Sequence, residues 1–220
     1  MKRLLTFLIC FSVLIFWSSC RNDFEFSPST GNLEFARDTV YLDTVFTNIG
    51  SSTYNLKVYN RSDEDIVIIP PPELDSHILK TGTANGPLWG GNLSLLMNRL
   101  GTDGQINTNG CILFLEDLDE YLYSFERMLV HLQAAGVFNN INGLIIGELI
   151  NMKDQDVSFG KSTDEIIMEI CGNMDIPIVT NFPCGHGKYQ TTLPISLPIE
   201  LCADETVTLK FLESAVTNKK

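Results

Sequence analysis

The chain has 220 residues, 44% of them hydrophobic, which is enough for one or two domains with a sizeable core. The formal net charge is −12 and no basic stripe occurs, which argues against nucleic acid as a partner. The six cysteines form no CxxC pair, and His77, His131 and His186 are scattered, so the sequence contains no metal-ligand cluster.

The amino-terminal stretch has the pattern of an export signal. Lys2 and Arg3 precede an apolar run, 4–17, which fits a signal peptide and is short for a membrane span. The small residues before Cys20 resemble a bacterial lipobox, in which the cysteine is acylated and becomes the mature amino terminus. We therefore expect residues 1–19 to be a lipoprotein signal peptide and Cys20 to carry the lipid anchor. The alternative is a cleaved secretory signal with an incidental cysteine.

The next segment, 20–72, reads as a polar tether followed by a short antiparallel β meander. Strand-like runs occur at 39–47, 54–59 and 66–69, and Pro70-Pro71-Pro72 ends the last of them. A complete β-sandwich needs about seven strands, so this segment resembles a truncated sandwich of a Bacteroides-type surface lipoprotein. Its expected role is that of a spacer.

From residue 73 to residue 214 the pattern changes to alternating strands and helices. This alternation predicts an α/β domain whose mixed, mainly buried sheet is flanked by helices, followed by a polar tail at 215–220. Continuous apolar runs predict buried strands. Strands are expected at 111–115, 143–148, 176–180, 197–201 and 206–212, and helices at 93–100, 123–135 and from Ser162 or Thr163 to Cys171.

The segment 86–92 is rich in glycine and is expected to form a loop that leads into the helix 93–100. Asn92 is placed to cap that helix and to leave free N–H groups that could receive a carboxylate. The spacing fits neither a Walker loop nor a dinucleotide fingerprint, which argues against nucleotide binding.

Three polar side chains stand where predicted strands end. Glu116 follows the strand 111–115, Glu148 ends the strand 143–148, and His186 lies between two glycines after the strand 176–180. Pro183 is expected to end that last strand, so that the imidazole is displayed on a loop. The spacing makes it plausible, without showing it, that these side chains converge at one rim. The other two histidines are expected to be structural or solvated.

The four cysteines of the α/β segment lie within or beside apolar runs. They are expected to be small buried hydrophobic residues, although a disulfide in an oxidising compartment stays open. These residues are Cys111, Cys171, Cys184 and Cys202.

Several segments stand in an order that resembles a known family. They include Gly86-Pro87-Leu88-Trp89-Gly90-Gly91-Asn92, Leu113-Phe114-Leu115-Glu116-Asp117, Gly143-Leu144-Ile145-Ile146-Gly147-Glu148 and Phe182-Pro183-Cys184-Gly185-His186-Gly187. Together they resemble the C-terminal domain of the LD-carboxypeptidase family of serine peptidases, over roughly residues 74–214. That family includes muropeptide LD-carboxypeptidases and microcin C immunity peptidases.

The resemblance implies a Ser–Glu–His triad that hydrolyses the L,D-amide of a muropeptide and needs neither a metal nor an organic cofactor. It places the triad residues at Glu116 and His186, with Gly90, Gly91 and Asn92 as candidates for the rim of the substrate site. The family's nucleophile lies on a Gly-x-Ser-Asp turn, and no such turn occurs in these 220 residues. We therefore expect the chain to be inactive alone.

Two other hypotheses for the function are open. The protein can be a non-enzymatic surface lipoprotein or scaffold that arose by gene fusion, or a separate chain can supply the nucleophile. An exposed interdomain face would then favour self-association. The leader predicts a lipid-anchored protein of the cell envelope, whereas family members that recycle peptidoglycan work in the cytoplasm.

Overall fold

The computed structural model describes residues 25–26, 33–35, 58–60, 67–71, 74 and 76–213. The predicted signal peptide, Cys20, the expected strand 39–47 and the tail 215–220 lie outside the described residues. In the described part of the chain, no helix is long and apolar enough to cross a membrane.

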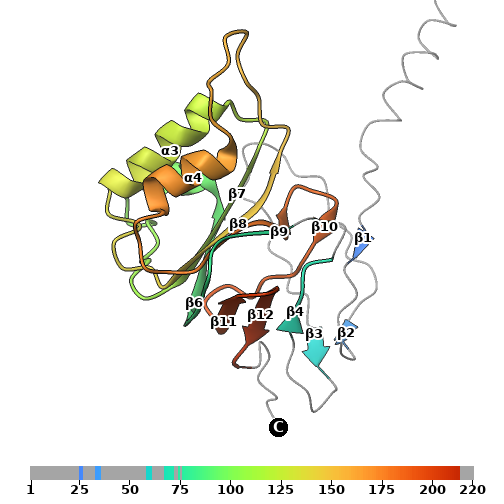
Figure 1. Cartoon of the computed structure of the whole chain (residues 1–220). Helices are drawn as coiled ribbons and strands as arrows, with labels where there is room; N and C mark the ends of the chain where they lie inside the picture. Colours follow the sequence, from blue (N-terminus) through green and yellow to red (C-terminus); the bar gives the residue numbers. More distant parts are fainter. Residues whose placement is uncertain are drawn as a thin grey trace, which may run out of the picture.

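An eight-stranded mixed sheet forms the centre of the described part (Figure 1). Its strands lie in the order β4-β12-β11-β6-β7-β8-β9-β5. The inner four, β6 to β9, are parallel, and β11, β12, β4 and β5 run antiparallel to their neighbours. The members of this sheet are β4 (Val67–Ile68), β5 (His77–Lys80), β6 (Gly82–Asn92), β7 (Ile112–Leu118), β8 (Gly143–Ile150), β9 (Ile178–Gly185), β11 (Pro198–Ala203) and β12 (Val207–Phe211).

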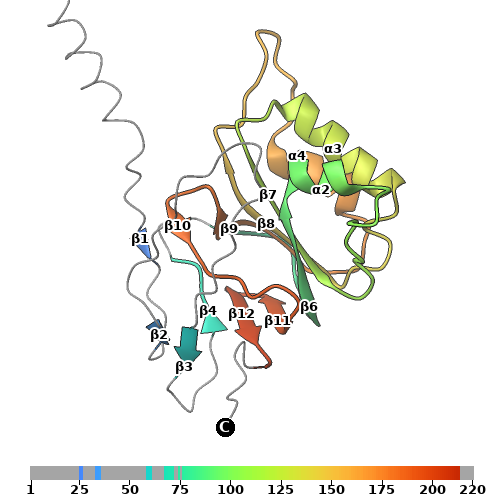
Figure 2. The same ribbon diagram turned by 180° about the vertical axis from the view of Figure 1, so that it is seen from behind.

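Three helices cover one face of the sheet (Figures 1 and 2). They are α2 (Leu93–Arg99), α3 (Leu122–Ala134) and α4 (Thr163–Cys171). The first core lies beneath them, where Phe125 and Leu129 of α3 pack with Leu113 and Ile146 of the sheet. On the opposite face, apolar residues of β11 and β12 form a second core with Ile145 of β8. Both faces of the central strands are therefore buried, which agrees with their continuous apolar sequences and confirms the predicted fold class.

The helix ends agree with the sequence signals. Asn92 is the N-cap of α2, and its side chain accepts a hydrogen bond from the backbone of Leu95. Ser162 opens α4 with a capping box closed by Glu165. Gly136, just beyond the end of α3, has φ +75°, the left-handed conformation that ends many helices.

The segment 86–92 is strand, so the predicted glycine-rich loop is wrong. It forms the second half of the long strand β6, which pairs with β7. A β carbon on Gly90 would lie 1.8 Å from the carbonyl oxygen of Phe114, so glycine allows the two backbones to approach closely. Glycines occupy positions where strands usually carry β-branched residues, so the sequence pattern did not predict this strand.

Pro183 also lies inside a strand, since β9 continues to Gly185. Gly147 of β8 pairs with Phe182, and Glu148 pairs with Gly185, so Pro183 and Cys184 form a bulge without partners in β8. Proline is tolerated there because a bulge does not need its missing N–H for the ladder. The expectation that Pro183 ends the strand is therefore wrong.

Short strands outside the main sheet involve the amino-terminal part. β2 (Leu33–Phe35) pairs antiparallel with β3 (Val58–Asn60), and β1 (Glu25–Phe26) pairs parallel with β10 (Tyr189–Gln190). Strand β4, within the predicted run 66–69, pairs with β12 of the main sheet. The expected third strand of a meander is thus an edge strand of the α/β domain. The sequence also missed β5, where His77 lies.

The four cysteines of the α/β domain are free in the described structure. Cys111, Cys171 and Cys184 are buried, and Cys202 is half-buried. The prediction of buried cysteines is therefore confirmed for the first three.

Candidate active site

The polar residues predicted at strand ends meet at one edge of the sheet. Asn92 of β6 pairs with Glu116 of β7, and Glu148 of β8 pairs with Gly185 of β9. The carboxyl ends of parallel strands share one edge of a sheet, which is the usual place for sites in open α/β sheets. The structure therefore brings Glu116, Glu148 and the turn that carries His186 together.

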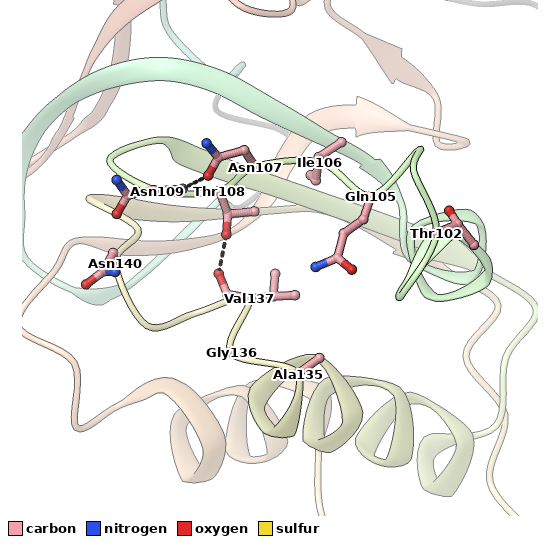
Figure 3. A pocket seen from close by; sticks show the side chains of 10 residues that line it. All are labelled: Thr102, Gln105, Ile106, Asn107, Thr108, Asn109, Ala135, Gly136, Val137 and Asn140. Atoms are coloured by element: carbon pink, nitrogen blue, oxygen red, sulfur yellow. Dashed lines mark hydrogen bonds between the residues drawn. The ribbon is translucent and has the colours of Figure 1, made fainter.

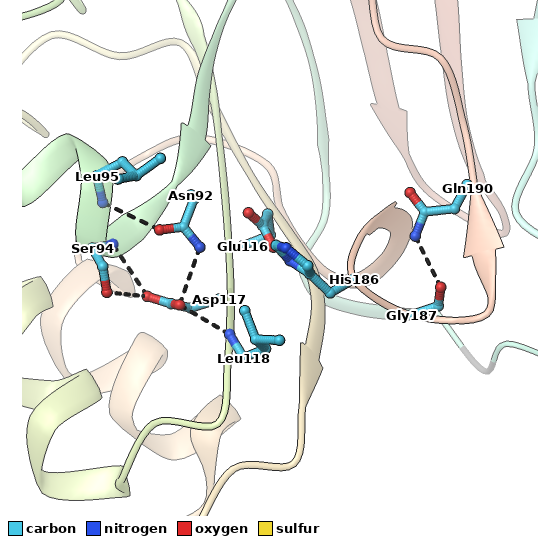
Figure 4. A network of polar contacts seen from close by, with 9 residues as sticks. All are labelled: Asn92, Ser94, Leu95, Glu116, Asp117, Leu118, His186, Gly187 and Gln190. Atoms are coloured by element: carbon cyan, nitrogen blue, oxygen red, sulfur yellow. Dashed lines mark hydrogen bonds and ion pairs between the residues drawn. The ribbon is translucent and has the colours of Figure 1, made fainter. Parts of the chain in front are cut away.

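Glu116 and His186 form the central contact of this edge (Figure 4). The Nδ1 atom of His186 lies 2.7 Å from Oε2 of Glu116, a short distance typical of a charge-assisted hydrogen bond. The Glu116 side chain is 8% exposed, whereas that of His186 is 49% exposed. A buried carboxylate thus orients an imidazole whose other side faces out of the described domain.

Two glycines make room for this pair. Gly185 has φ +115°, and a β carbon there would lie 3.0 Å from Oε2 of Glu116. A β carbon on Gly147 would lie 3.1 Å from the β carbon of Glu116 and 2.4 Å from the carbonyl oxygen of Cys184. Any larger residue at either position would push the turn away from the carboxylate.

The turn after β9 is closed by its own hydrogen bonds. The backbone N–H of Thr191 donates to the carbonyl oxygen of Pro183 at 2.8 Å, and the side chain of Gln190 donates to the carbonyl oxygen of Gly187 at 2.9 Å. His186 lies within the turn that these two hydrogen bonds close. They explain how an exposed imidazole keeps a defined position.

Asp117 has different hydrogen-bond partners from its neighbour Glu116. It is 3% exposed and accepts from Nδ2 of Asn92 at 3.1 Å. It also accepts from the backbone N–H and the hydroxyl of Ser94, at 3.1 and 2.9 Å, and from the backbone N–H of Leu118 at 2.9 Å. Sequence reasoning gave Asp117 no role, although a second carboxylate beside Glu116 was the available signal.

These contacts bear on the residues proposed for the substrate rim. The Asn92 amide is engaged by Asp117 and Leu95, and the N–H of Ser94, which could have received a carboxylate, already donates to Asp117. A β carbon on Gly91 would meet no atom within 4 Å, so open space lies beside its backbone. Of the two glycines predicted at the rim, Gly91 is therefore the one with open space beside its backbone.

Glu148 is the third buried carboxylate at this edge, with 5% exposure. Burial raises the pKa of its carboxyl above the ordinary 4.5, and hydrogen bonds from the backbone N–H groups of Tyr189 and Lys188 offset only part of that rise. The folded state therefore binds this proton more tightly than the unfolded chain.

This linkage predicts a pH-dependent stability difference between the parent chain and Glu148→Gln. Since the pKa is raised on folding, the stabilising contribution is fully present below the unfolded pKa and is lost as pH rises through the folded pKa. We expect the parent to lose stability relative to Glu148→Gln as the pH rises above about 4.5. Urea unfolding of both proteins across this range measures the difference, and a difference independent of pH would contradict it.

Cys184 lies close to both carboxylates but is poorly suited to be a nucleophile. Burial raises the pKa of its thiol to about 12, and the charges of Glu116 and Glu148 add to the rise. The thiolate is the reactive form of cysteine, so this residue is held in its inert form.

A cavity of about 530 Å³ lies at the other end of the sheet (Figure 3). Its walls precede β7 and β8, at the amino ends of the parallel strands, so it is separate from the edge that carries Glu116. In the part of the chain that the structure describes, no group of three or more potential metal ligands occurs. The cavity is lined by Thr102, Gln105, Ile106, Asn107, Thr108, Asn109, Ala135, Gly136, Val137 and Asn140.

The sequence profile of the LD-carboxypeptidase C-terminal domain matches residues 85–201, more than half of the chain. The chain belongs to the LD-carboxypeptidase family. The match spans β6 to β11 and includes Asn92, Glu116, Glu148 and His186.

Individual members of the LD-carboxypeptidase family support this assignment. The chain is 33% identical over 117 residues to the "probable murein peptide carboxypeptidase" of Bacillus subtilis, covering 53% of this chain and 37% of that protein. It is 30% identical over 110 residues to the murein tetrapeptide carboxypeptidase of Pseudomonas aeruginosa, covering 50% of this chain and 35% of that one.

A solved structure of the family has the same fold. The muramoyltetrapeptide carboxypeptidase from Oxalobacter formigenes superposes with a TM-score of 0.57 at 29% identity, covering 67% of this chain and 50% of that one. The chain thus matches half of this family member and about a third of the two curated relatives.

Proposed function

We propose that this chain supplies the acid–base half of a serine-type LD-carboxypeptidase site that acts on muropeptides. The observation that carries the proposal is the 2.7 Å contact between Nδ1 of His186 and Oε2 of Glu116 at the carboxyl edge of the sheet. The names of the relatives, which refer to murein peptides and muramoyltetrapeptide, favour a muropeptide as substrate.

In this mechanism Glu116 accepts the Nδ1–H of His186 and leaves Nε2 free as a base. Nε2 takes the proton of a serine hydroxyl while the serine oxygen attacks the carbonyl of the L,D-amide, and Glu116 stabilises the imidazolium that forms. His186 then gives the proton to the leaving amine of the terminal D-amino acid. Water, activated by the same imidazole, hydrolyses the acyl-enzyme.

We propose that the serine comes from a separate, nucleophile-bearing half, because no Gly-x-Ser-Asp turn occurs in these 220 residues. The half-exposed His186 side chain is accessible to a surface of that half. Leu95 and Tyr121, which follow β6 and β7, are 67% and 41% exposed near the same edge. We propose that this edge receives the nucleophile-bearing half and that it drives self-association when that half is missing, which light scattering would detect.

We predict that the purified chain alone releases no D-alanine from an L,D-tetrapeptide. The positive test is a chimera in which residues 76–213 replace the matched part of the B. subtilis relative, so that the relative supplies the nucleophile. Turnover is expected in the chimera and is expected to be lost with His186→Ala. The matched control is His131→Ala, on the exposed face of α3. Release by the parent chain alone, lost with His186→Ala, would contradict the prediction.

We also propose that Cys20 anchors the protein by acyl chains to the cell envelope, on the strength of the leader sequence. Metabolic labelling with a palmitate analogue is expected to label the full chain, and Cys20→Ser is expected to abolish the label. Labelling that persists in Cys20→Ser would exclude this anchor.

A further inference from the structure

The mechanism gives no task to Glu148, although it is buried at the active edge. It ends the pairing of β8 with β9, beside the bulge of Pro183 and Cys184. The groups that face it are the Cys184 thiol, the backbone of the turn after His186 and, through Cys184, the Glu116 carboxylate. Within the described residues, its Oε1 has no hydrogen-bond partner.

The turn that carries His186 rests directly on this carboxylate. A β carbon on Gly187 would lie 2.1 Å from the carboxyl carbon and from both carboxylate oxygens of Glu148. The backbone N–H groups of Lys188 and Tyr189 donate hydrogen bonds to the same group. Three consecutive residues after His186 therefore contact one side chain of the neighbouring strand.

The other contacts of this turn do not attach it to β7 or β8. The bonds from Thr191 to Pro183 and from Gln190 to Gly187 lie within the turn, so they set its shape without attaching it to β7 or β8. The pairing of β10 with β1 is two residues long and lies outside the main sheet. Among the contacts described for this turn, those of Glu116 and Glu148 are the side-chain contacts that attach it to β7 and β8.

We propose that Glu148 is a positioning residue that fixes the turn 185–190, so that Nδ1 of His186 stays on Glu116. The inference rests on the proposed function only in taking His186 as the base. What matters is the acceptor oxygen under the backbone N–H groups. Glutamine at position 148 therefore keeps an acceptor oxygen for these N–H groups, and alanine removes it.

The test reads the tautomer of His186 in the full chain without any catalysis. In protein labelled with 15N-histidine, neutral His186 of the parent is expected to be mainly the Nδ1–H form, because Glu116 accepts that proton. Glu148→Ala is expected to shift the ring-nitrogen signals toward the Nε2–H form, and Glu148→Gln is expected to restore the parental signals. Glu205→Gln, in the exposed turn between β11 and β12, is the charge-matched control.

A second variant separates positioning from folding. Gly187→Ala puts a methyl group against the carboxylate and is expected to shift the His186 signals as Glu148→Ala does, with no further shift in the double variant. Signals of His77 and His131 report whether the domain remains folded. Parental His186 signals in both single variants would overturn the proposal. A shifted tautomer together with an inactive chimera would leave the positioning role standing and remove the proposed function.

Discussion

Glu116→Gln is expected to lower the turnover of the chimera by about 10⁴-fold while leaving its fold intact. The glutamine occupies nearly the same volume, but it cannot stabilise the imidazolium of His186 as a charge does. Its amide can also present an N–H to Nδ1 and so favour the wrong tautomer. The 2.7 Å contact with His186 and the 8% exposure of the Glu116 side chain are the basis for so large an effect from a substitution that nearly conserves volume.

Steady-state release of D-alanine from an L,D-tetrapeptide measures the effect, with circular dichroism as the check on folding. Glu205→Gln changes the charge equally at an exposed turn and is expected to leave the rate unchanged. A loss below about tenfold would mean that Glu116 does not orient the base, since a general base alone contributes about 10²–10⁴-fold.

Asp117→Ala is expected to destabilise the domain by about 3 kcal/mol, because buried donors left without acceptors cost about 1–3 kcal/mol each. Four donor groups, from Asn92, Ser94 and Leu118, point at this carboxylate. Its removal leaves them unsatisfied beneath the start of α2. Urea unfolding of the full chain measures the change.

Two substitutions serve as references for Asp117→Ala. Asp117→Asn keeps one acceptor oxygen and is expected to cost about half as much or less, since fewer donors are orphaned. Asp156→Ala, in the exposed loop before α4, is expected to change stability by less than about 0.5 kcal/mol. Equal effects of the three variants would show that Asp117 does not hold the start of α2.

The sequence predicted the parts of the fold that follow simple periodicity. Continuous apolar runs identified β7 and β8, and the helical spacing with its caps identified α3 and α4 within one or two residues. It failed for β6, whose strand structure depends on Gly90 lying against Phe114, a contact across the sheet that no local pattern reveals. It also failed at Pro183, because the bulge that admits proline is a property of the pairing with β8.

The sequence allowed the residues of the site to be predicted, but not how they lie relative to one another. Glu116, Glu148 and His186 could be selected because each stands at or just after the end of an apolar run that predicts a strand. Their convergence depends on strand order, which places β8 between β7 and β9. The separate tasks of Glu116 and Asp117 could not be assigned, because adjacent residues of a strand point to opposite faces and the bulge decides which one meets His186.

Because the pairing of β7, β8 and β9 is irregular, the number of residues in these strands is constrained more strictly than the identity of each residue. Leu115 pairs with Ile146 and Asp117 with Leu149, so β8 carries an unmatched residue beside Glu116, and β9 carries the unmatched pair at Pro183 and Cys184. Losing or gaining one residue here turns every later side chain to the other face of the sheet. Single-residue deletions within β8 or β9 should therefore be eliminated more strongly than substitutions at the same positions in a selected library.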